Sequence, residues 1–66
     1  MENKIISLQD LAQQYAAKWD LYRNGFINEE EIRAIREFIR VLIGDKESYE
    51  EMMREVGNIL NREYNK

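Results

Sequence analysis

Three arginines recur in one stretch of the chain at spacings of three and four residues. On an α-helix, these spacings place the side chains of Arg33, Arg36 and Arg40 along one side. A guanidinium group forks onto carboxylate or phosphate oxygens through parallel N–H donors. The row therefore predicts contact with an acidic protein partner or, as an alternative, binding of nucleic acid or a phosphate ligand. A solvated face neutralised by Glu29 and Glu37 is the simpler interpretation of the same row.

Acidic, amide and glycine residues between Asp20 and Glu31 stand at the positions of a known loop pattern. Asp20 begins a twelve-residue segment, Gly25 stands at its sixth position, Ile27 at its eighth and Glu31 at its twelfth. This pattern resembles the calcium-binding loop of the EF-hand family, and apolar flanks extend the resemblance over residues 12–39. The resemblance implies a helix–loop–helix unit and a calcium site. The metal ligands that it implies are Asp20, Asn24, the backbone carbonyl of Phe26, Asn28 and Glu31.

Two residues of this segment depart from the family pattern. Tyr22 stands at the third ligand position and cannot supply a carboxylate, and Arg23 adds a positive charge. EF-hands also normally work in pairs, and no second loop is evident. We therefore predict that calcium changes little, and we keep a degenerate EF-hand module as an alternative function. No other cofactor is expected.

Large aromatic and methionine side chains are numerous for a chain of 66 residues. Most of them should form the core. A surplus would suit a protein interface, where tyrosine, tryptophan, methionine and arginine are enriched. The predicted partner-binding residues are therefore Arg33, Arg36, Arg40, Tyr15, Trp19 and Tyr22.

Catalysis has little support in the residue types present. The chain has no histidine and no cysteine, which removes the commonest general base and the thiol nucleophile. Its two serines, Ser7 and Ser48, are explained as helix caps. We predict that the protein is not an enzyme.

Apolar residues recur at helical spacing in three segments, which predicts helices over about 7–23, 28–43 and 46–64. The expected end signals are Ser7, Asn24-Gly25, the capping box of Asn28 with Glu31, and Gly44. The central apolar stripe consists of Ile32, Ile35, Ile39 and Leu42, widened by Ala34, Phe38, Val41 and Ile43. An arc this wide usually has two packing neighbours.

The third helix has two candidate caps. Either Asp45 or Ser48 could begin it, and Ser48 is favoured because Glu51 follows three residues later. Gly57 inside this helix costs about 1 kcal/mol relative to alanine, which predicts a close packing contact there.

These signals together predict one all-α domain over residues 1–66, a small three-helix bundle with a helix–loop–helix core. A chain of this size buries a small core, so we expect a homo-oligomer, with a homodimer as its simplest form. The net charge of −3 argues against nucleic acid as the partner. No apolar run could span a bilayer and no export signal is evident, so we expect a cytoplasmic protein without a membrane contact.

The leading functional interpretation is a small non-enzymatic binding or regulatory protein that acts by stoichiometric contact with another protein. Its compactness is similar to that of small inhibitors encoded by phages and mobile elements, which is an analogy of size and fold class.

Overall fold

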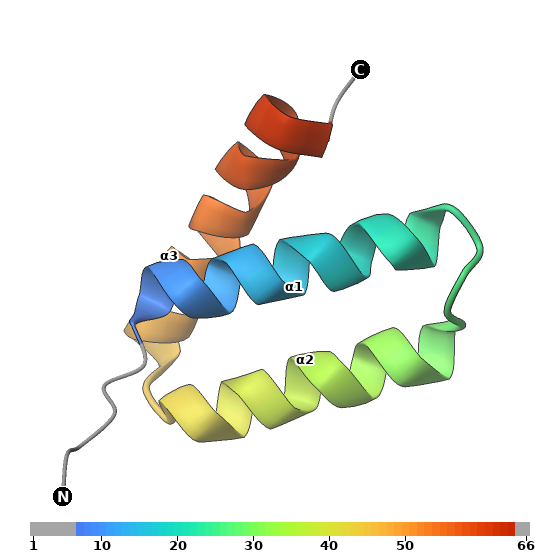
Figure 1. Ribbon diagram of the computed structural model, residues 1–66. Helices are drawn as coiled ribbons and strands as arrows, with labels where there is room; N and C mark the ends of the chain where they lie inside the picture. Colours follow the sequence, from blue (N-terminus) through green and yellow to red (C-terminus); the bar gives the residue numbers. More distant parts are fainter. Residues whose placement is uncertain (1–6, 65–66) are drawn as a thin grey trace, which may run out of the picture.

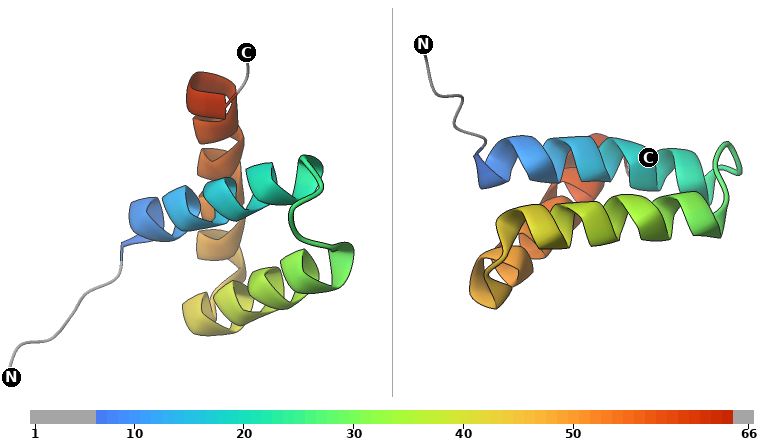
Figure 2. Two further views of the ribbon diagram at one scale, coloured as in Figure 1. Left: turned by 45° about the vertical axis from the view of Figure 1, so that its right-hand side comes forward. Right: turned by 90° about the horizontal axis from the view of Figure 1, so that it is seen from below.

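Three helices and one terminal turn make up the protein in a computed structural model that describes residues 7–64. They are α1 (Leu8–Arg23), α2 (Glu29–Ile43), α3 (Lys46–Ile59) and the π-helical turn η1 (Leu60–Tyr64). α1 and α2 lie side by side and run antiparallel, and α3 crosses behind α1 at a steep angle (Figures 1 and 2). The prediction of a small all-α three-helix bundle is confirmed.

The first two helices begin at the predicted caps. The Ser7 hydroxyl accepts a hydrogen bond of 3.0 Å from the backbone N–H of Asp10. At α2 the Asn28 side chain accepts from the backbone N–H of Glu31 at 2.8 Å, and the Glu31 carboxylate accepts from the backbone N–H of Asn28 at 3.2 Å. This reciprocal pair satisfies two backbone donors that the helix itself leaves unpaired.

The third helix starts at the other candidate cap, so the preference for Ser48 is wrong. Asp45 has an extended backbone and its carboxylate accepts from the backbone N–H of Ser48. The reason lies one residue earlier, where Gly44 ends α2 in the left-handed conformation with φ of +79°. A second helix can then start at once, and Ser48 falls within its first turn.

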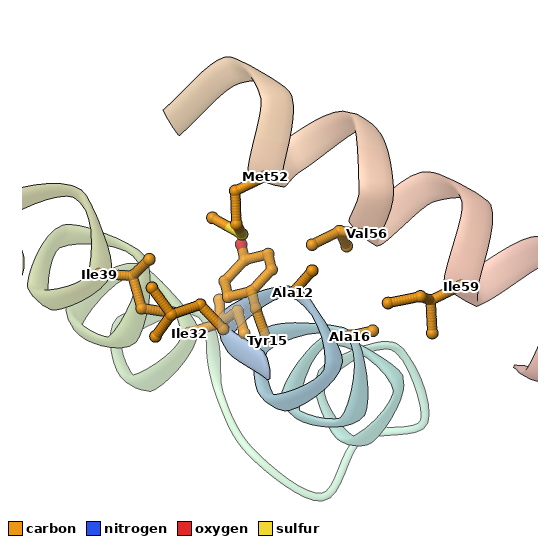
Figure 3. Close-up of a cluster of buried hydrophobic side chains, with 9 residues drawn as sticks. Ala12, Tyr15, Ala16, Ile32, Ile39, Met52, Val56 and Ile59 are labelled. Atoms are coloured by element: carbon orange, nitrogen blue, oxygen red, sulfur yellow. The ribbon is translucent and has the colours of Figure 1, made fainter. Parts of the chain in front are cut away.

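The core lies where the three helices meet (Figure 3). Ala12 and Ala16 of α1 face Val56 and Ile59 of α3, and these small side chains let the two helices cross closely. The ring of Tyr15 stands at the centre. Its neighbours in the picture are Ile32 and Ile39 from α2 and Met52 from α3. The alternation of small and large residues along α1 therefore sets how both other helices pack.

The end of the third helix differs from the sequence prediction. The α-helix stops at Ile59, and the chain continues in η1 to Tyr64. The expected close contact at Gly57 is also wrong. A Cβ atom added to Gly57 would meet nothing within 4 Å, and the residue is exposed. Its lack of a side chain therefore has no explanation in the packing of this chain.

Candidate functional site

The arginine row divides into two outer members and a central one. Arg33 pairs with Glu29 at 2.8 Å, and Arg40 pairs with Glu37. The hydrogen bond from Arg40 holds the pKa of the Glu37 carboxyl below its ordinary value. Arg36 is half-buried and forms no ion pair with any residue in the range 7–64. The row therefore has an ion pair at each end, while the central Arg36 lies near Glu37 without forming an ion pair in the described part of the chain.

The aromatic residues of α1 form a continuous row of rings. The ring centroids of Tyr15 and Trp19 are 6.4 Å apart, and those of Trp19 and Tyr22 are 5.1 Å apart. Trp19 and Tyr22 are half-buried, whereas Tyr15 is only 1 % exposed. Tyr15 is thus chiefly a core residue, and only its neighbours along α1 reach the surface.

The Tyr15 hydroxyl is an exception to the rule that buried polar atoms are paired. Its oxygen is buried and has no hydrogen-bond partner among the described residues. Burial raises the pKa of Tyr15, and the nearby positive charge of Arg36 acts in the opposite direction. The Arg36 guanidinium therefore lies close to the Tyr15 hydroxyl, and both its charge and its polar contact with that hydroxyl oppose the rise in the pKa of Tyr15.

A groove opens where α1, α2 and α3 diverge, with a volume of about 300 Å³. We call it the aromatic groove. Its lining residues include Tyr15, Trp19, Arg36, Met53, Gly57 and Leu60. The structure thus brings together three of the predicted partner-binding residues from two helices. The other three, Tyr22, Arg33 and Arg40, lie outside this lining.

A second surface lies on α2. Phe38 is 66 % exposed, Val41 65 % and Leu42 47 %. Their spacings of three and four residues place them on one side of the helix. Ile32 and Ile39 of the same helix are buried in the core. We refer to Phe38, Val41 and Leu42 as the α2 face.

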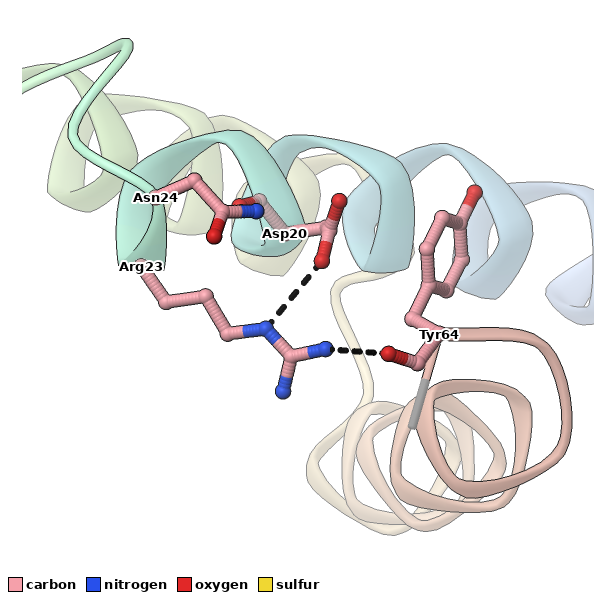
Figure 4. A network of polar contacts seen from close by, with 4 residues as sticks. All are labelled: Asp20, Arg23, Asn24 and Tyr64. Carbon is pink, nitrogen blue, oxygen red and sulfur yellow. Dashed lines mark hydrogen bonds and ion pairs between the residues drawn. The ribbon is translucent and has the colours of Figure 1, made fainter. Parts of the chain in front are cut away.

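The loop that resembles an EF-hand is arranged around helix ends. Asp20 lies within α1, and its carboxylate accepts from the Arg23 guanidinium at 3.1 Å. Arg23 also donates to the backbone carbonyl of Tyr64 at 2.8 Å, which joins the end of α1 to η1 (Figure 4). The Asn24 side chain donates to the backbone carbonyl of Asp20 at 2.8 Å. The first implied ligand is therefore engaged with the cation that departs from the family pattern.

The remaining implied ligands have comparable local roles. Asn28 and Glu31 form the capping box of α2. Phe26 is an exposed loop residue, and its backbone N–H, not the carbonyl that would be the ligand, donates a hydrogen bond to the Leu21 carbonyl. Within residues 7–64, no group of three or more acidic, histidine or cysteine side chains is placed to hold a metal ion. Calcium binding stays a prediction for a titration to test.

Known proteins provide no independent guide to these surfaces. No protein-family model, curated protein or solved structure matches the chain. The α2 face and the aromatic groove are therefore the two candidate sites of this chain. No helix in the described part of the chain is long and apolar enough to cross a membrane.

The α2 face is the surface that sequence reasoning missed. The apolar arc of α2 does pack against both neighbours, but they cover only the side that carries Ile32 and Ile39. The sequence feature that could have revealed the α2 face is the width of the apolar arc of α2. Positions 38, 41 and 42 lie toward one edge of it at 100° per residue, away from the buried positions 32 and 39. An arc wider than its neighbours can cover predicts an exposed apolar edge.

Proposed function

We propose that the chain is a small non-enzymatic protein-binding module that acts by stoichiometric contact through the α2 face. The observation that carries this proposal is the exposure of Phe38, Val41 and Leu42 side by side on one helix. Single exposed apolar residues are ordinary, but adjacent large ones commonly mark interaction sites. An aromatic side chain on such a surface is a typical interface anchor.

The helix that carries this face is held at both ends. The capping box fixes the start of α2, and Gly44 ends it in a single turn. A helix ordered before binding loses little conformational entropy when it docks, which favours affinity. An apolar helix face of this kind suits a groove on another protein or the same face of a second copy. A homo-oligomer is thus one form of the proposal, and inhibition or regulation by covering a partner's surface, in the cytoplasm, is another.

The arginine row offers a partner a separate polar contact, because at 100° per residue it lies on the side of α2 opposite the α2 face. Arg33 and Arg40 are exposed and already near glutamates, so they can exchange these partners for acids on another protein at little loss. We expect replacement of Arg33, Arg36 and Arg40 with glutamine to preserve the helical circular dichroism and to weaken partner capture. Unfolding of this triple variant would mean that the row is structural.

A capture experiment with matched variants tests the main proposal. The tagged chain is used to isolate partners from the cells that express it, alongside Phe38→Gln/Val41→Gln and, as control, Phe26→Gln. Phe26 is 75 % exposed but lies in the turn between α1 and α2. All three proteins should show the same helical signal, because the changed residues are exposed.

We expect the double variant to lose the partner at least about tenfold, whereas Phe26→Gln retains it, since central interface anchors typically contribute 2 kcal/mol or more. Sedimentation equilibrium of the same proteins shows whether the partner is a second copy. Equal capture by the wild type and the double variant would refute the proposal, as would equal loss in both variants.

A further inference from the structure

We propose that the aromatic groove binds a small apolar carboxylate, with a hydrocarbon body of about eight carbon atoms and one anionic headgroup. The groove is separate from the α2 face, so this inference does not depend on the protein-binding proposal. It rests on three features of the described residues: an apolar lining, an open wall and a half-buried arginine that forms no ion pair.

The lining suits a hydrocarbon body. Tyr15 and Trp19 contribute from α1, while Met53 and Leu60 contribute from α3 and η1. The volume of about 300 Å³ is at the lower end of the range for small-molecule sites. Aromatic and thioether side chains are also adaptable apolar surfaces. The size therefore favours one short chain or one ring over a larger ligand.

The open wall is due to Gly57. This residue lines the groove, and a Cβ atom at its position would meet nothing within 4 Å. A glycine inside a helix is unfavourable, and the packing of this chain gives no reason for it. Gly57 is exposed, so a larger side chain has open space at the rim of the groove. The missing side chain thus keeps open the space that a ligand would fill.

The cation gives the groove its preference for an anion. Arg33 and Arg40 each have a glutamate beside them, but Arg36 has no carboxylate within ion-pair distance in the described part of the chain. Arg36 is half-buried at the groove, where a charge without a counter-ion is unfavourable. A bound carboxylate would accept two parallel hydrogen bonds from the guanidinium group of Arg36.

The buried hydroxyl of Tyr15 lies near Arg36, and Figure 3 shows it beside Met52. It lacks a hydrogen-bond partner among residues 7–64, although Tyr15 is 1 % exposed and lines the groove. Unpaired buried polar atoms are rare in folded proteins and usually indicate a missing partner. A buried hydroxyl without a hydrogen-bond partner by distance and angle therefore lies close to the arginine that would hold the headgroup.

Three probes with the same hydrocarbon body and different headgroups test the proposal: octanoate, 1-octanol and octylamine. Trp19 is the only tryptophan in the chain and lines the groove, so its fluorescence reports binding, and calorimetry supplies the affinity. We expect octanoate to bind with a dissociation constant of about 1 mM or tighter, as befits a ligand of this size. We expect 1-octanol to bind at least about fivefold more weakly and octylamine more weakly still, because only the carboxylate pairs with Arg36.

Two variants and two controls place the site. Arg36→Gln should weaken octanoate at least about fivefold and leave 1-octanol unchanged, since it removes only the charge-assisted bonds. Arg33→Gln, on the same helix and outside the groove, should change the affinity for neither octanoate nor 1-octanol. Gly57→Met should abolish the binding of octanoate and of 1-octanol by filling the groove. The variant should fold, because methionine favours the helix more than glycine does. Phe38→Gln should leave octanoate binding unchanged.

Equal affinity for octanoate and 1-octanol would overturn the proposal, as would octanoate binding that survives Gly57→Met or is unaffected by Arg36→Gln. Absence of saturable octanoate binding up to about 10 mM would do the same, because this is well above the expected dissociation constant. None of these outcomes bears on partner capture through the α2 face, so the two proposals fail separately.

Discussion

The backbone N–H of Ser48 donates a hydrogen bond of 3.0 Å to the Oδ2 atom of Asp45. The hydroxyl and the backbone N–H of Ser48 together hold the pKa of the Asp45 carboxyl below its ordinary value of 3.8. Asp45 is also the residue at which the chain turns from α2 into α3. The cap therefore links the position of the third helix to the ionised state of one carboxyl group.

We predict that Asp45→Ala destabilises the protein, whereas Asp45→Asn retains most of the cap because an amide oxygen also accepts from the helix N-terminus. The pH dependence follows from the depressed pKa. The stabilisation by ionised Asp45 is fully present above 3.8, the ordinary value, and is lost as the pH falls through the lower pKa of the folded state. Urea unfolding of wild type and Asp45→Asn at pH 7 and pH 3 measures this. We expect the stability advantage of the wild type over Asp45→Asn to be smaller at pH 3 than at pH 7. An advantage of the same size at both pH values would contradict the prediction.

Gly57→Ala should stabilise the protein by up to about 1 kcal/mol, because alanine is the better helix former and its methyl group has open space. Thermal unfolding followed by circular dichroism gives the change in melting temperature. Gly44→Ala is the matched control and should destabilise, since Gly44 has a φ of +79°. A destabilised Gly57→Ala would show that the position packs closely after all.

Helix ends and the core were largely predictable from local sequence. Ser7, Asn28 and Gly44 act through hydrogen bonds and backbone conformations that involve only nearby residues, so their roles could be deduced without the fold. The choice between Asp45 and Ser48 could not be made in this way, because both residues fit the capping motif. In the structure Asp45, directly after Gly44, is the N-cap.

The two candidate surfaces depend on how the helices cross, which the sequence does not specify. α3 covers only part of the apolar arc of α2 and leaves Phe38 exposed. The same crossing places Arg36 beside Tyr15 and Gly57 at a groove. Spacing along α2 made the three arginines look equivalent, but the packing of α1 and α3 separates the central one from its neighbours.

Tyr15→Phe should leave the stability unchanged or raise it by up to about 1 kcal/mol, because it removes a buried hydroxyl that has no partner. Tyr15→Ala, in contrast, should destabilise by about 3 kcal/mol or more through the cavity that it leaves. Urea unfolding of both variants measures the two effects. Marked destabilisation by Tyr15→Phe would indicate that the hydroxyl is hydrogen-bonded in solution.

We predict that millimolar calcium changes the stability and the helical signal little. Asp20 is engaged by Arg23, and Glu31 caps α2, so calcium would have to displace both contacts. Isothermal titration with calcium is the direct measurement. Micromolar binding that is abolished by Glu31→Gln would overturn this prediction and favour the EF-hand interpretation.

The central claim is that the α2 face contacts another protein chain, and site-specific photo-crosslinking tests it most directly. The photoreactive residue p-benzoylphenylalanine replaces Phe38 in one protein and Phe26 in another, and each is irradiated in the cells that express it. We predict a discrete adduct of one chain with one protein partner, or with a second copy, from position 38 and none from position 26. Equal adducts from both positions, or no adduct from position 38, would contradict the account.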